Sequence, residues 1–544
     1  MPDARPMIQQ FQFLLNREAI LSLALVWVSG SLMALATAPL NLFLLAWAAL
    51  APLWRLAFLA PLAPKVASPP LLLALFWGVG YHGLALSWIL GLHPLTWLGV
   101  PWLGSIAIAL FCWAFITLWG AALVMIWVAV LPWALGRSGQ SQSIKLSLAR
   151  VLVGTAIWCA LEWIWSLGSL YWTSLSYTQS PGNLVVLHLG QLSGPALVTA
   201  AIVAVNGLLA EAWMHWQMAG PAAVRAVGRY LRLAGSAIGV FCLMHLIGFG
   251  LYSRPLADVE ANGLKIGIIQ GNVPTRIKLN RDGLRQAEIA YTKGYKALAA
   301  EAVDAVLTPE GALPYLWNSA NRSSSSLYQA ILQQGTVVWL GTFTQQDGKI
   351  ARSLITLLSN GETAGQYNKI KLVPLGEYVP FQNLLGGLVQ ILSPIEAQGL
   401  PGQLQQRFNT PFGIAIASIC YDSAFPEVFR SQAAIGGQFI LTASNLDPYS
   451  QVLMAQHQAQ DIMRAIETDR WAARATNTGY SGLVDPHGHV IWRSRPQTYE
   501  VYAGHLYRRQ GQTLYVRWGD WLTPLLLVIA VGISHRRLRG ESRF

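Results

Sequence analysis

The chain has 544 residues, 53% of them hydrophobic and only 11% charged, and its formal net charge is +12. Soluble domains usually have about 25% charged residues, so this composition excludes a protein that is soluble throughout. The shortage of charge is uneven. Residues 19–252 form a series of long apolar stretches, whereas residues 264–509 have the mixed composition of a folded aqueous domain. The sequence therefore predicts a membrane region followed by a soluble domain.

Eight apolar runs are long enough to cross a bilayer as helices, which takes about 20 residues. They occupy residues 19–38, 40–62, 71–92, 102–135, 149–167, 194–214, 232–252 and 518–535. We interpret residues 102–135 as one long, tilted span, since two spans of about 17 residues and a turn would barely fit there. We expect the first run to remain as an uncleaved helix, because further spans follow it directly.

Basic residues in the loops predict the orientation of the bundle, since cytoplasmic loops accumulate Lys and Arg. The loops after the fourth and sixth runs and the C-terminal tail contain Arg137, Lys145, Arg150, Arg225, Arg229, Arg232, Arg536, Arg537, Arg539 and Arg543. The alternate loops, at residues 37–41, 92–101 and 168–183, contain neither Lys nor Arg. We therefore expect both termini in the cytoplasm and the soluble domain on the periplasmic or extracellular side. The positive charge is then mainly an orientation signal, and we expect no nucleic-acid partner.

The soluble part alternates short apolar runs with amphipathic stretches, which is typical of an α/β layered fold. The sequence thus predicts three parts. Residues 1–255 form a seven-span α-helical transmembrane bundle, and residues 256–512 form an extracytoplasmic α/β domain. Residues 513–544 form an eighth transmembrane helix with a basic cytoplasmic tail.

Cys420 is the only thiol of the soluble domain, because Cys112, Cys159 and Cys242 lie in predicted spans, where we expect small packing residues. A lone cysteine in an oxidising compartment calls for a chemical explanation. Cys420 ends the strand-like string IAIASIC, and Glu310 ends the string AVLTPE. Catalytic residues of α/β folds tend to lie at such strand ends. A nucleophilic thiol also requires a base and a group that stabilises the oxyanion.

Metal and serine-hydrolase chemistry are not indicated by the sequence. The ten histidines are scattered, and His487 and His489 have no Cys or Glu companions that would complete a zinc site. A GxSxG string is absent. We therefore expect neither a metal nor a cofactor, and the chemistry falls to a carboxylate, a lysine and the cysteine.

Five strings carry a specific resemblance: LTPEG, YNKIKLVPLGEYVPF, SICYDSAFPEVFR, TASN and RAIETDRWAARATNTGYSGLVDPHG. In this order they resemble the nitrilase, or carbon-nitrogen hydrolase, superfamily. With seven spans before them and one after, the chain resembles the apolipoprotein N-acyltransferase family, and the resemblance covers nearly the whole chain. It implies an αββα sandwich for the soluble domain and a Glu-Lys-Cys triad at Glu310, Lys369 and Cys420, with a second glutamate at Glu377.

The resemblance also implies a role for each of these residues. Glu310 is expected to be the general base, and Lys369 to stabilise the thiolate and, with the backbone N–H of Tyr421, the oxyanion. Glu377 is expected to position Lys369 and Glu310. Lys371 faces the opposite side of an extended segment, so we expect it at the surface or behind the triad.

The sequence departs from the acyltransferases at two places. They usually have Cys-Tyr-Glu at the nucleophile, whereas Asp422 follows Tyr421 here, and Cys-Tyr-Asp is common in soluble nitrilase-type amidases. The loop LDPYS also lacks the Asn-Asp and Trp-Phe pairs expected after Asn445. Since aspartate is one methylene shorter than glutamate, we expect any contact of this side chain with the base or thiol to be rebuilt.

Several residues outside the triad are candidates for contacts with lipid or with the scaffold. Glu162 lies in a span, where an unpartnered carboxylate is costly. Trp172, Tyr177 and Gln179 follow in an aromatic, uncharged segment that also fits an interfacial belt. Residues 384–400 are apolar and rich in glycine, and they fit either a loop packed on the domain or a membrane-dipping lid.

The leading hypothesis is acyl transfer at the bacterial plasma (inner) membrane. Cys420 takes an acyl chain from a phospholipid as a thioester and passes it to the α-amine of a lipoprotein's N-terminal diacylglyceryl-cysteine. The expected partners are therefore phospholipid, apolipoprotein and membrane lipids, and we expect a monomer. Two alternatives stay open: a membrane-tethered nitrilase-type amidase, and a catalytically silent membrane scaffold that binds lipid or lipoprotein.

Overall fold

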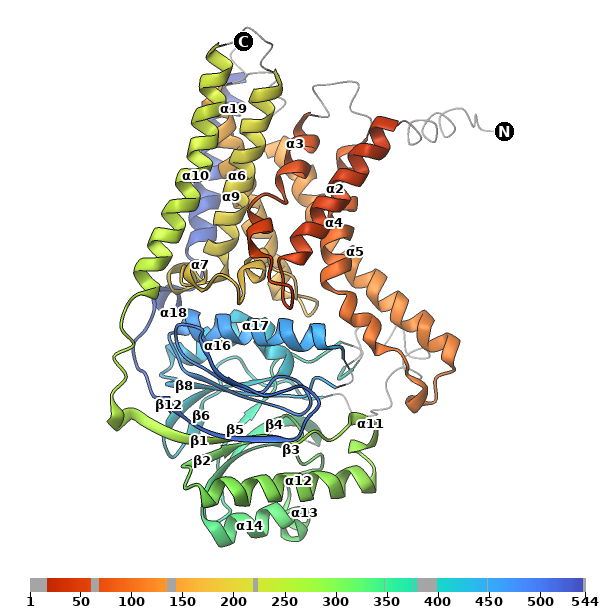
Figure 1. Cartoon of the computed structure of the whole chain (residues 1–544), viewed down its shortest axis with the longest axis vertical. Coiled ribbons are helices and arrows are strands. Elements are labelled where there is room, and N and C mark those ends of the chain that lie inside the picture. Colours follow the sequence, from red (N-terminus) through yellow and green to blue (C-terminus); the bar gives the residue numbers. More distant parts are fainter. Residues whose placement is uncertain are drawn as a thin grey trace.

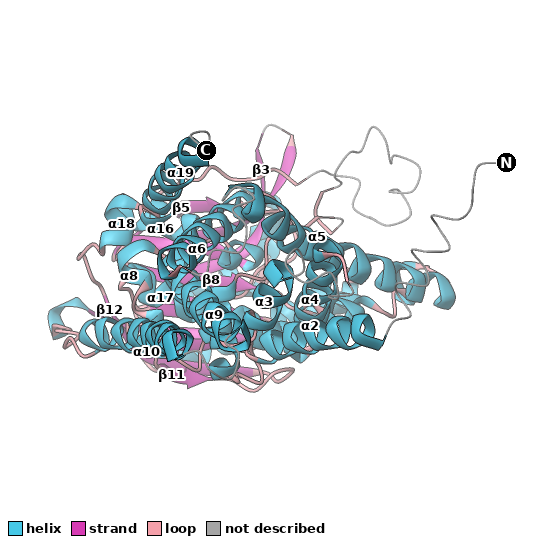
Figure 2. Ribbon diagram, turned by 90° about the horizontal axis from the view of Figure 1, so that it is seen from above, coloured by secondary structure: helices cyan, strands magenta, loops and turns pink. Residues whose placement is uncertain are grey.

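The protein was analysed as a computed structural model, which describes residues 17–59, 68–134, 143–218, 224–346, 348–374, 376–378, 399–447, 449–541. A helical bundle stands on a soluble α/β domain, and the described part of the chain begins and ends at the far side of the bundle from that domain (Figure 1). Seen from above, one part of the bundle overlies the sheets of the soluble domain and the other part extends beyond them to one side (Figure 2). The predicted fold class, a helical bundle with a nitrilase-like α/β domain, is confirmed.

Each of the eight apolar runs contains helix. The long elements are α2 (Arg17–Leu35), α3 (Ala51–Leu59), α4 (Pro70–Ala85), α5 (Trp102–Ala134), α6 (Ile144–Leu167), α9 (Pro195–Met218), α10 (Val224–Tyr252) and α19 (Leu522–Glu541). Five of them, α2, α5, α6, α9 and α10, are long and apolar enough to cross a membrane by length and composition, whereas α3, α4 and α19 have shorter apolar stretches. The number of spans therefore stays a prediction, although α5 is one continuous helix of 33 residues.

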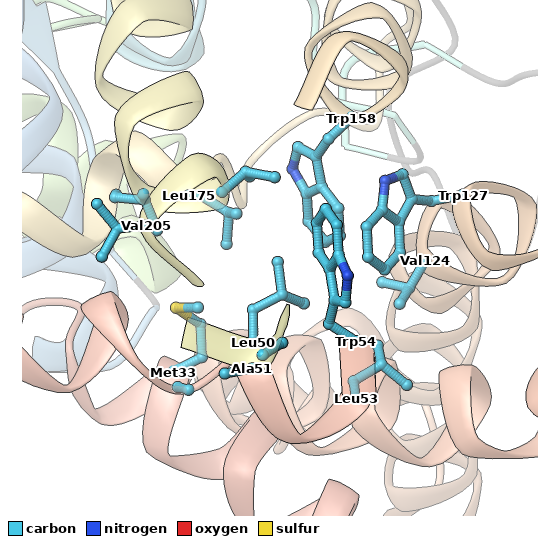
Figure 3. Packing of buried hydrophobic residues seen from close by; sticks show 14 of the residues in the cluster. Met33, Leu50, Ala51, Leu53, Trp54, Val124, Trp127, Trp158, Leu175 and Val205 are labelled. Carbon is cyan, nitrogen blue, oxygen red and sulfur yellow. The ribbon is translucent and has the colours of Figure 1, made fainter. Parts of the chain in front are cut away.

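Tryptophans form the centre of the bundle (Figure 3). Trp54 of α3 packs edge-on against Trp127 of α5 at 5.1 Å between ring centroids, and Trp127 packs against Trp158 of α6 at 5.2 Å. Gly154 and Gly207 make room for these rings, because a Cβ atom at either position would lie within 3 Å of Trp54. Helices α3, α5, α6 and α9 are thus held around one aromatic cluster.

Two six-stranded sheets form the soluble domain. The first has the order β12-β1-β2-β3-β4-β5 and the second the order β11-β10-β9-β8-β7-β6. The strands are β1 (Gly263–Gln270), β2 (Ala305–Leu307), β3 (Val337–Gln346), β4 (Lys349–Leu357), β5 (Thr363–Asn368), β6 (Phe408–Thr410), β7 (Gly413–Ile419), β8 (Phe439–Ser444), β9 (Ala472–Thr476), β10 (Gly482–Val484), β11 (Val490–Arg493) and β12 (Glu500–Tyr507). Pairing is parallel between β1 and β2, β2 and β3, β7 and β8, and β8 and β9, while the outer pairs are antiparallel.

Helices cover both outer faces of the paired sheets. Helices α12 (Arg281–Ala300) and α14 (Ser326–Gln334) lie on the side away from the bundle, and α16 (Pro426–Ala434) and α17 (Gln451–Thr468) lie between the second sheet and the bundle (Figure 1). This is the αββα sandwich that the resemblance implies. Nearly every side chain of α17 is buried, because it has a sheet on one side and the bundle on the other.

The segment between α6 and α9 fills the space above α17. It contains the short helices η4 (Leu175–Gln179), α7 (Leu184–Leu187) and α8 (Gly190–Ser193). Ser180 donates a hydrogen bond to the carbonyl of Ala459 (2.6 Å). Helix α18 (Leu514–Trp518) packs against α8 and α16, so the chain returns to the bundle only at α19. The predicted domain limits at residues 255 and 512 both fall in connecting segments.

Candidate active site

Cys420 follows directly on β7 and begins the short turn η6 (Cys420–Ala424). Its φ of 50° lies in the left-handed region, which is unfavourable for a residue with a Cβ atom. Strained backbone of this kind often occurs at functional sites. The side chain is 8% exposed, and its Sγ atom lies 3.8 Å from the carbonyl oxygen of Asn445. The strand end and the turn therefore place a single, largely buried thiol at the carboxyl end of β7.

A chain of charges lies beside this thiol. The ammonium group of Lys369, which follows β5, is fully buried and donates to Glu310 Oε1 (2.9 Å) and Glu377 Oε1 (2.7 Å). Arg352, on β4, forms a further ion pair with Glu377 (3.1 Å). The structure thus brings Glu310, Lys369 and Glu377 together as the sequence analysis expected, and the electrostatic influence of all three reaches Cys420.

Burial and neighbouring charges together determine the protonation states of Glu310, Lys369 and Cys420. Burial alone would raise the pKa of Glu310, but the positive charges of Lys369 and Arg352 outweigh burial and hold it below its ordinary value. Burial would likewise lower the pKa of Lys369, but the two carboxylates raise it. Burial and then the charge of Glu310 raise the pKa of Cys420 to about 12. At neutral pH the site therefore holds an ionised glutamate, a lysinium and a neutral thiol.

Asp422 lies behind the triad, and its partners are not the expected ones. Its carboxylate accepts hydrogen bonds from the backbone N–H groups of Ile419 (3.0 Å) and Lys371 (2.7 Å) and from the hydroxyl of Tyr367 (2.9 Å). Burial raises its pKa to about 6. We had expected any contact of this side chain with the base or thiol to be rebuilt. The carboxylate of Asp422 instead binds backbone N–H groups and the hydroxyl of Tyr367. Asp422 joins the segment that carries Lys369 to the turn that carries the cysteine.

Lys371 and Tyr421 flank this arrangement. The ammonium of Lys371 lies 4.2 Å from the centre of the ring of Phe425, the residue that follows the nucleophile's turn. The Tyr421 hydroxyl donates to the carbonyls of Ser169 (2.8 Å) and Tyr171 (3.1 Å), in the segment between α6 and α9. The residue after the nucleophile is therefore anchored to the membrane half of the chain.

The sequence analysis did not single out several side chains that touch the site. The backbone N–H of Asn445 donates to Glu310 Oε2 (3.2 Å), and Lys278 donates to the Glu310 carbonyl (3.1 Å). Lys278 is buried, and burial lowers its pKa to about 8. Asn445 lies in the TASN string, so its place in this string could have indicated that it lies at the site. Lys278 and Arg352 sit in segments without a recognisable pattern, and only the fold brings Lys278 to Glu310 and Arg352 to Glu377.

The candidates of the membrane half take different positions. Glu162 is buried and accepts hydrogen bonds from Trp158 (3.0 Å), Ser174 (2.8 Å), Thr199 (3.0 Å) and the backbone N–H of Leu175 (2.9 Å). It is therefore fully partnered, and it fixes the end of α6 to the segment that follows.

The other three candidates lie in that following segment. Trp172 donates to Gln456 of α17 (2.8 Å), and its ring stacks on Tyr421 at 6.0 Å. The Tyr177 hydroxyl donates to the carbonyl of Ala424 (2.8 Å), while Gln179 accepts from Trp47 (3.1 Å) within the bundle. Trp172 and Tyr177 thus contact the turn that carries the nucleophile, whereas Gln179 does not. The predicted lid lies outside the described residues except at 399 and 400.

A cavity lies between the bundle and Trp172. It encloses about 20 Å³, which is about the room that one water molecule needs, and is lined by His82, Leu86, Ile116, Trp119, Gly120, Leu123, Glu162, Trp165, Leu170, Tyr171, Trp172 and Thr173. Its lining comes mainly from α5 and from residues 170–173, and it includes Trp172, whose ring stacks on Tyr421. Within the described ranges, no group of three His, Cys, Asp or Glu side chains is placed to hold a metal ion.

Two family profiles match the chain. The profile described as the apolipoprotein N-acyltransferase N-terminal domain matches residues 29–208, and the carbon-nitrogen hydrolase profile matches residues 265–509. The chain is 19% identical to the C. elegans NitFhit protein, with a TM-score of 0.36 over 49% of this chain and 65% of that one.

Relatives named apolipoprotein N-acyltransferase align with almost the whole chain. The Nostoc sp. protein is 53% identical over 92% of this chain and 96% of its own length. The Synechocystis sp. protein is 46% identical over 92% and 97%, and the Thermosynechococcus vestitus protein is 41% identical over 93% of each. Together with the apolar helices, these relatives indicate a bacterial membrane protein, and the chain belongs to the apolipoprotein N-acyltransferase family.

Proposed function

We propose that the protein transfers an acyl chain from a phospholipid, through a thioester on Cys420, to the α-amine of the diacylglyceryl-cysteine of a lipoprotein. The observation that carries this proposal is the neutral, buried thiol beside the ionised pair of Glu310 and Lys369. An ionised carboxylate is ready to accept a proton, and a lysinium is ready to receive negative charge. The family membership of the chain supports the lipid and lipoprotein substrates.

In the first step, Sγ of Cys420 attacks the ester carbonyl carbon while its proton passes to Glu310. A high pKa keeps the thiol protonated until the substrate arrives, so proton transfer and attack are coupled. Lys369 and the backbone N–H of Tyr421 stabilise the oxyanion. The carbon–oxygen bond then breaks, and Glu310 returns the proton to the departing lysophospholipid. The product is a thioester on Cys420.

In the second step, the lipoprotein amine attacks the thioester carbonyl and Glu310 accepts a proton from the nitrogen. The carbon–sulfur bond breaks, and the thiol regains its proton from Glu310. The product is an amide and the free enzyme. Glu377 takes no part in the proton transfer, but it holds Lys369 against Glu310, since the ammonium bridges both carboxylates.

We propose that the reaction takes place on the extracytoplasmic face of the membrane, with both termini in the cytoplasm. The alternation of basic and uncharged loops supports this orientation. The soluble domain lies against the bundle through α17 (Figure 1), and Trp172, from the segment after α6, donates a hydrogen bond to Gln456 of α17. This placement suits an acyl chain that stays in lipid while its ester reaches the thiol, and the exclusion of water protects the thioester from hydrolysis. We expect the protein to act as a monomer.

The amidase alternative loses its main support. Asp422 was the residue that favoured it, yet its carboxylate binds backbone N–H groups and Tyr367, which is a structural arrangement that serves either reaction. A silent scaffold has no need for ion pairs among Glu310, Lys369 and Glu377 whose charges act on a buried Cys420.

The proposal is tested by incubating the purified enzyme with labelled phospholipid and then adding a diacylglyceryl-cysteine peptide. Mass spectrometry is expected to show an acyl group on Cys420, followed by its transfer to the peptide amine. Cys420→Ala is expected to lose both signals, while Cys242→Ala, which changes an exposed thiol of α10, keeps both. Acyl-enzyme that persists in Cys420→Ala would refute the nucleophile. Release of free fatty acid without transfer to the peptide would instead favour the hydrolase.

A further inference from the structure

A buried histidine holds the backbone of the nucleophile. His457 lies on α17, 1% exposed, and its Nε2 atom is 2.9 Å from the carbonyl oxygen of Cys420. Its other ring nitrogen, Nδ1, is 2.8 Å from Nη1 of Arg474 on β9. Arg474 also forms an ion pair with Asp461, one turn further along α17, and donates to the Tyr480 carbonyl (2.8 Å). We call the three side chains His457, Arg474 and Asp461 the buried strut. None of them belongs to the triad.

The partners of His457 fix its tautomer. A guanidinium can only donate, so Nδ1 of His457 must be the acceptor of the Arg474 hydrogen bond. The ring proton is therefore on Nε2, which donates to the carbonyl of Cys420. The charged groups that face the ring are Arg474 and Asp461, with Lys369 further away, and burial followed by Arg474 lowers the pKa of His457. The ring is neutral, and its single proton is directed at the nucleophile's carbonyl.

The peptide bond that this contact holds is the one between Cys420 and Tyr421. A trans peptide is planar, and its C=O and N–H groups point in opposite directions. When α17 binds the carbonyl of Cys420, the N–H of Tyr421 points away from α17. Glu310 and Lys369 follow strands of the first sheet. The second sheet lies between α17 and the first sheet (Figure 1). The N–H of Tyr421 is therefore turned toward the side of the fold from which these two residues approach.

We propose that His457 is a positioning residue for the oxyanion site: by binding the carbonyl of Cys420, it aims the N–H of Tyr421 at the ester oxygen that becomes negatively charged. Arg474 and Asp461 act one step behind it, because they set which ring nitrogen carries the proton. The inference rests on the proposed acyl transfer through Cys420. It adds a requirement for a correctly aimed oxyanion donor. This requirement applies to attack at a carbonyl group and not to other reactions of the thiol.

Two reactions of the same thiol separate these requirements. Acylation by phospholipid ester passes through an oxyanion, whereas alkylation by iodoacetamide displaces iodide from a saturated carbon and forms no oxyanion. The loss of one oxyanion donor typically slows catalysis by about 100-fold or more. In His457→Asn, the shorter amide still offers Arg474 an acceptor but falls short of the Cys420 carbonyl. We expect acylation about 100-fold slower, with an unchanged KM and with alkylation within about threefold of the wild-type rate.

His457→Gln is the matched variant, since its amide nitrogen can occupy the place of Nε2. We expect it to restore acylation to within about tenfold of wild type. If both reactions of His457→Asn slow together, His457 supports the fold or the thiol itself and the inference is wrong. If His457→Asn acylates normally, the inference is also wrong.

Asp461→Asn covers the case in which His457→Asn does not fold. It keeps the shape of the side chain but weakens the ion pair that aims Arg474, so acylation is expected to fall by about tenfold while alkylation stays unchanged. Equal rates in Asp461→Asn and wild type would contradict the strut. Wild-type enzyme that is alkylated but never acylated would refute the proposed function itself, which is a different result from any of these.

Discussion

The membrane bundle and the soluble domain each enclose a glutamate among hydrogen-bond donors, and they satisfy its carboxylate in different ways. Glu162 accepts hydrogen bonds from four neutral donors in the described part of the chain. Glu310 accepts from a lysinium and from one backbone N–H. Neutral donors hold a carboxylate in place without fixing its charge, whereas a buried lysinium holds Glu310 ionised beside a protonated thiol.

This difference separates the work of the two glutamates. An ionised carboxylate beside a thiol of high pKa is a base that awaits an electrophile. A carboxylate that binds Trp158, Ser174, Thr199 and a backbone N–H is a joint between helices and the segment that follows them. The predictions below change one side of this comparison at a time.

The largest expected effect is that of Glu310→Gln. The amide cannot accept the thiol proton, and it leaves Lys369 with a single carboxylate partner. Loss of a general base usually costs about 10²–10⁴-fold in rate. We expect acyl-enzyme formation to fall by about 10³-fold, measured as the rate of labelled acyl transfer to Cys420.

Glu288→Gln is a control for this change. Glu288 binds Tyr315, Ser325 and Ser326 at the far side of the first sheet and is expected to leave the acylation rate unchanged. A Glu310→Gln enzyme that acylates at the wild-type rate would mean that another group takes the thiol proton.

The second prediction concerns pH and Asp422. Its carboxylate accepts the N–H groups that hold the Lys369 segment, and its pKa is about 6. Protonation removes acceptor capacity, so the acylation rate is expected to fall about tenfold per pH unit below pH 6. Glu310 stays ionised over this range, because its pKa is held below the ordinary value.

Stability is expected to change in the opposite direction. The folded-state pKa of Asp422 lies above the ordinary value of 3.8, so the folded protein binds more protons between about pH 4 and 6. The contribution of this group to the free energy of unfolding therefore increases as the pH falls from 6 to 4. Glu467, whose pKa burial raises to about 7, acts in the same direction. The acylation rate and the midpoint of thermal unfolding are to be measured together from pH 7 to 5. A parallel fall of both quantities would contradict this assignment.

The third prediction changes the other glutamate. Glu162→Gln keeps one acceptor oxygen and places an NH₂ group against donors. An unsatisfied buried donor costs about 1–3 kcal/mol, so the midpoint of thermal unfolding in detergent is expected to fall. The acylation rate of the folded enzyme is expected to stay within about threefold of wild type. A loss as large as that of Glu310→Gln would show that Glu162 takes part in the reaction and would break the comparison.

The sequence predicted the parts of the protein whose signal is local or ordered along the chain. Apolar runs indicated each long helix, and five strings in order indicated the sandwich and brought Glu310, Lys369 and Cys420 together. The hydrogen-bond partners of Asp422 were not predictable, because an aspartate in a sequence does not show whether a thiol or backbone N–H groups lie next to it in the fold. Lys278 and His457 were missed for a related reason: the role of each depends on which groups the fold places beside it, namely the carbonyl of Glu310 and the carbonyl of Cys420.

The smallest expected effect is that of Trp172→Phe, where the two regions meet. The change keeps an aromatic ring to stack on Tyr421 and removes the indole N–H that donates to Gln456. Loss of such a hydrogen bond costs about 1 kcal/mol, so a small drop in the unfolding midpoint is expected. Gln456 adjoins His457, and its amide also donates to the carbonyl of Ala85 in the bundle (2.9 Å), which keeps α17 attached. Acylation is therefore expected to slow by no more than about fivefold. Trp172→Ala removes the ring as well, and a rate equal to that of Trp172→Phe would mean that stacking on Tyr421 does not help to place the nucleophile's turn.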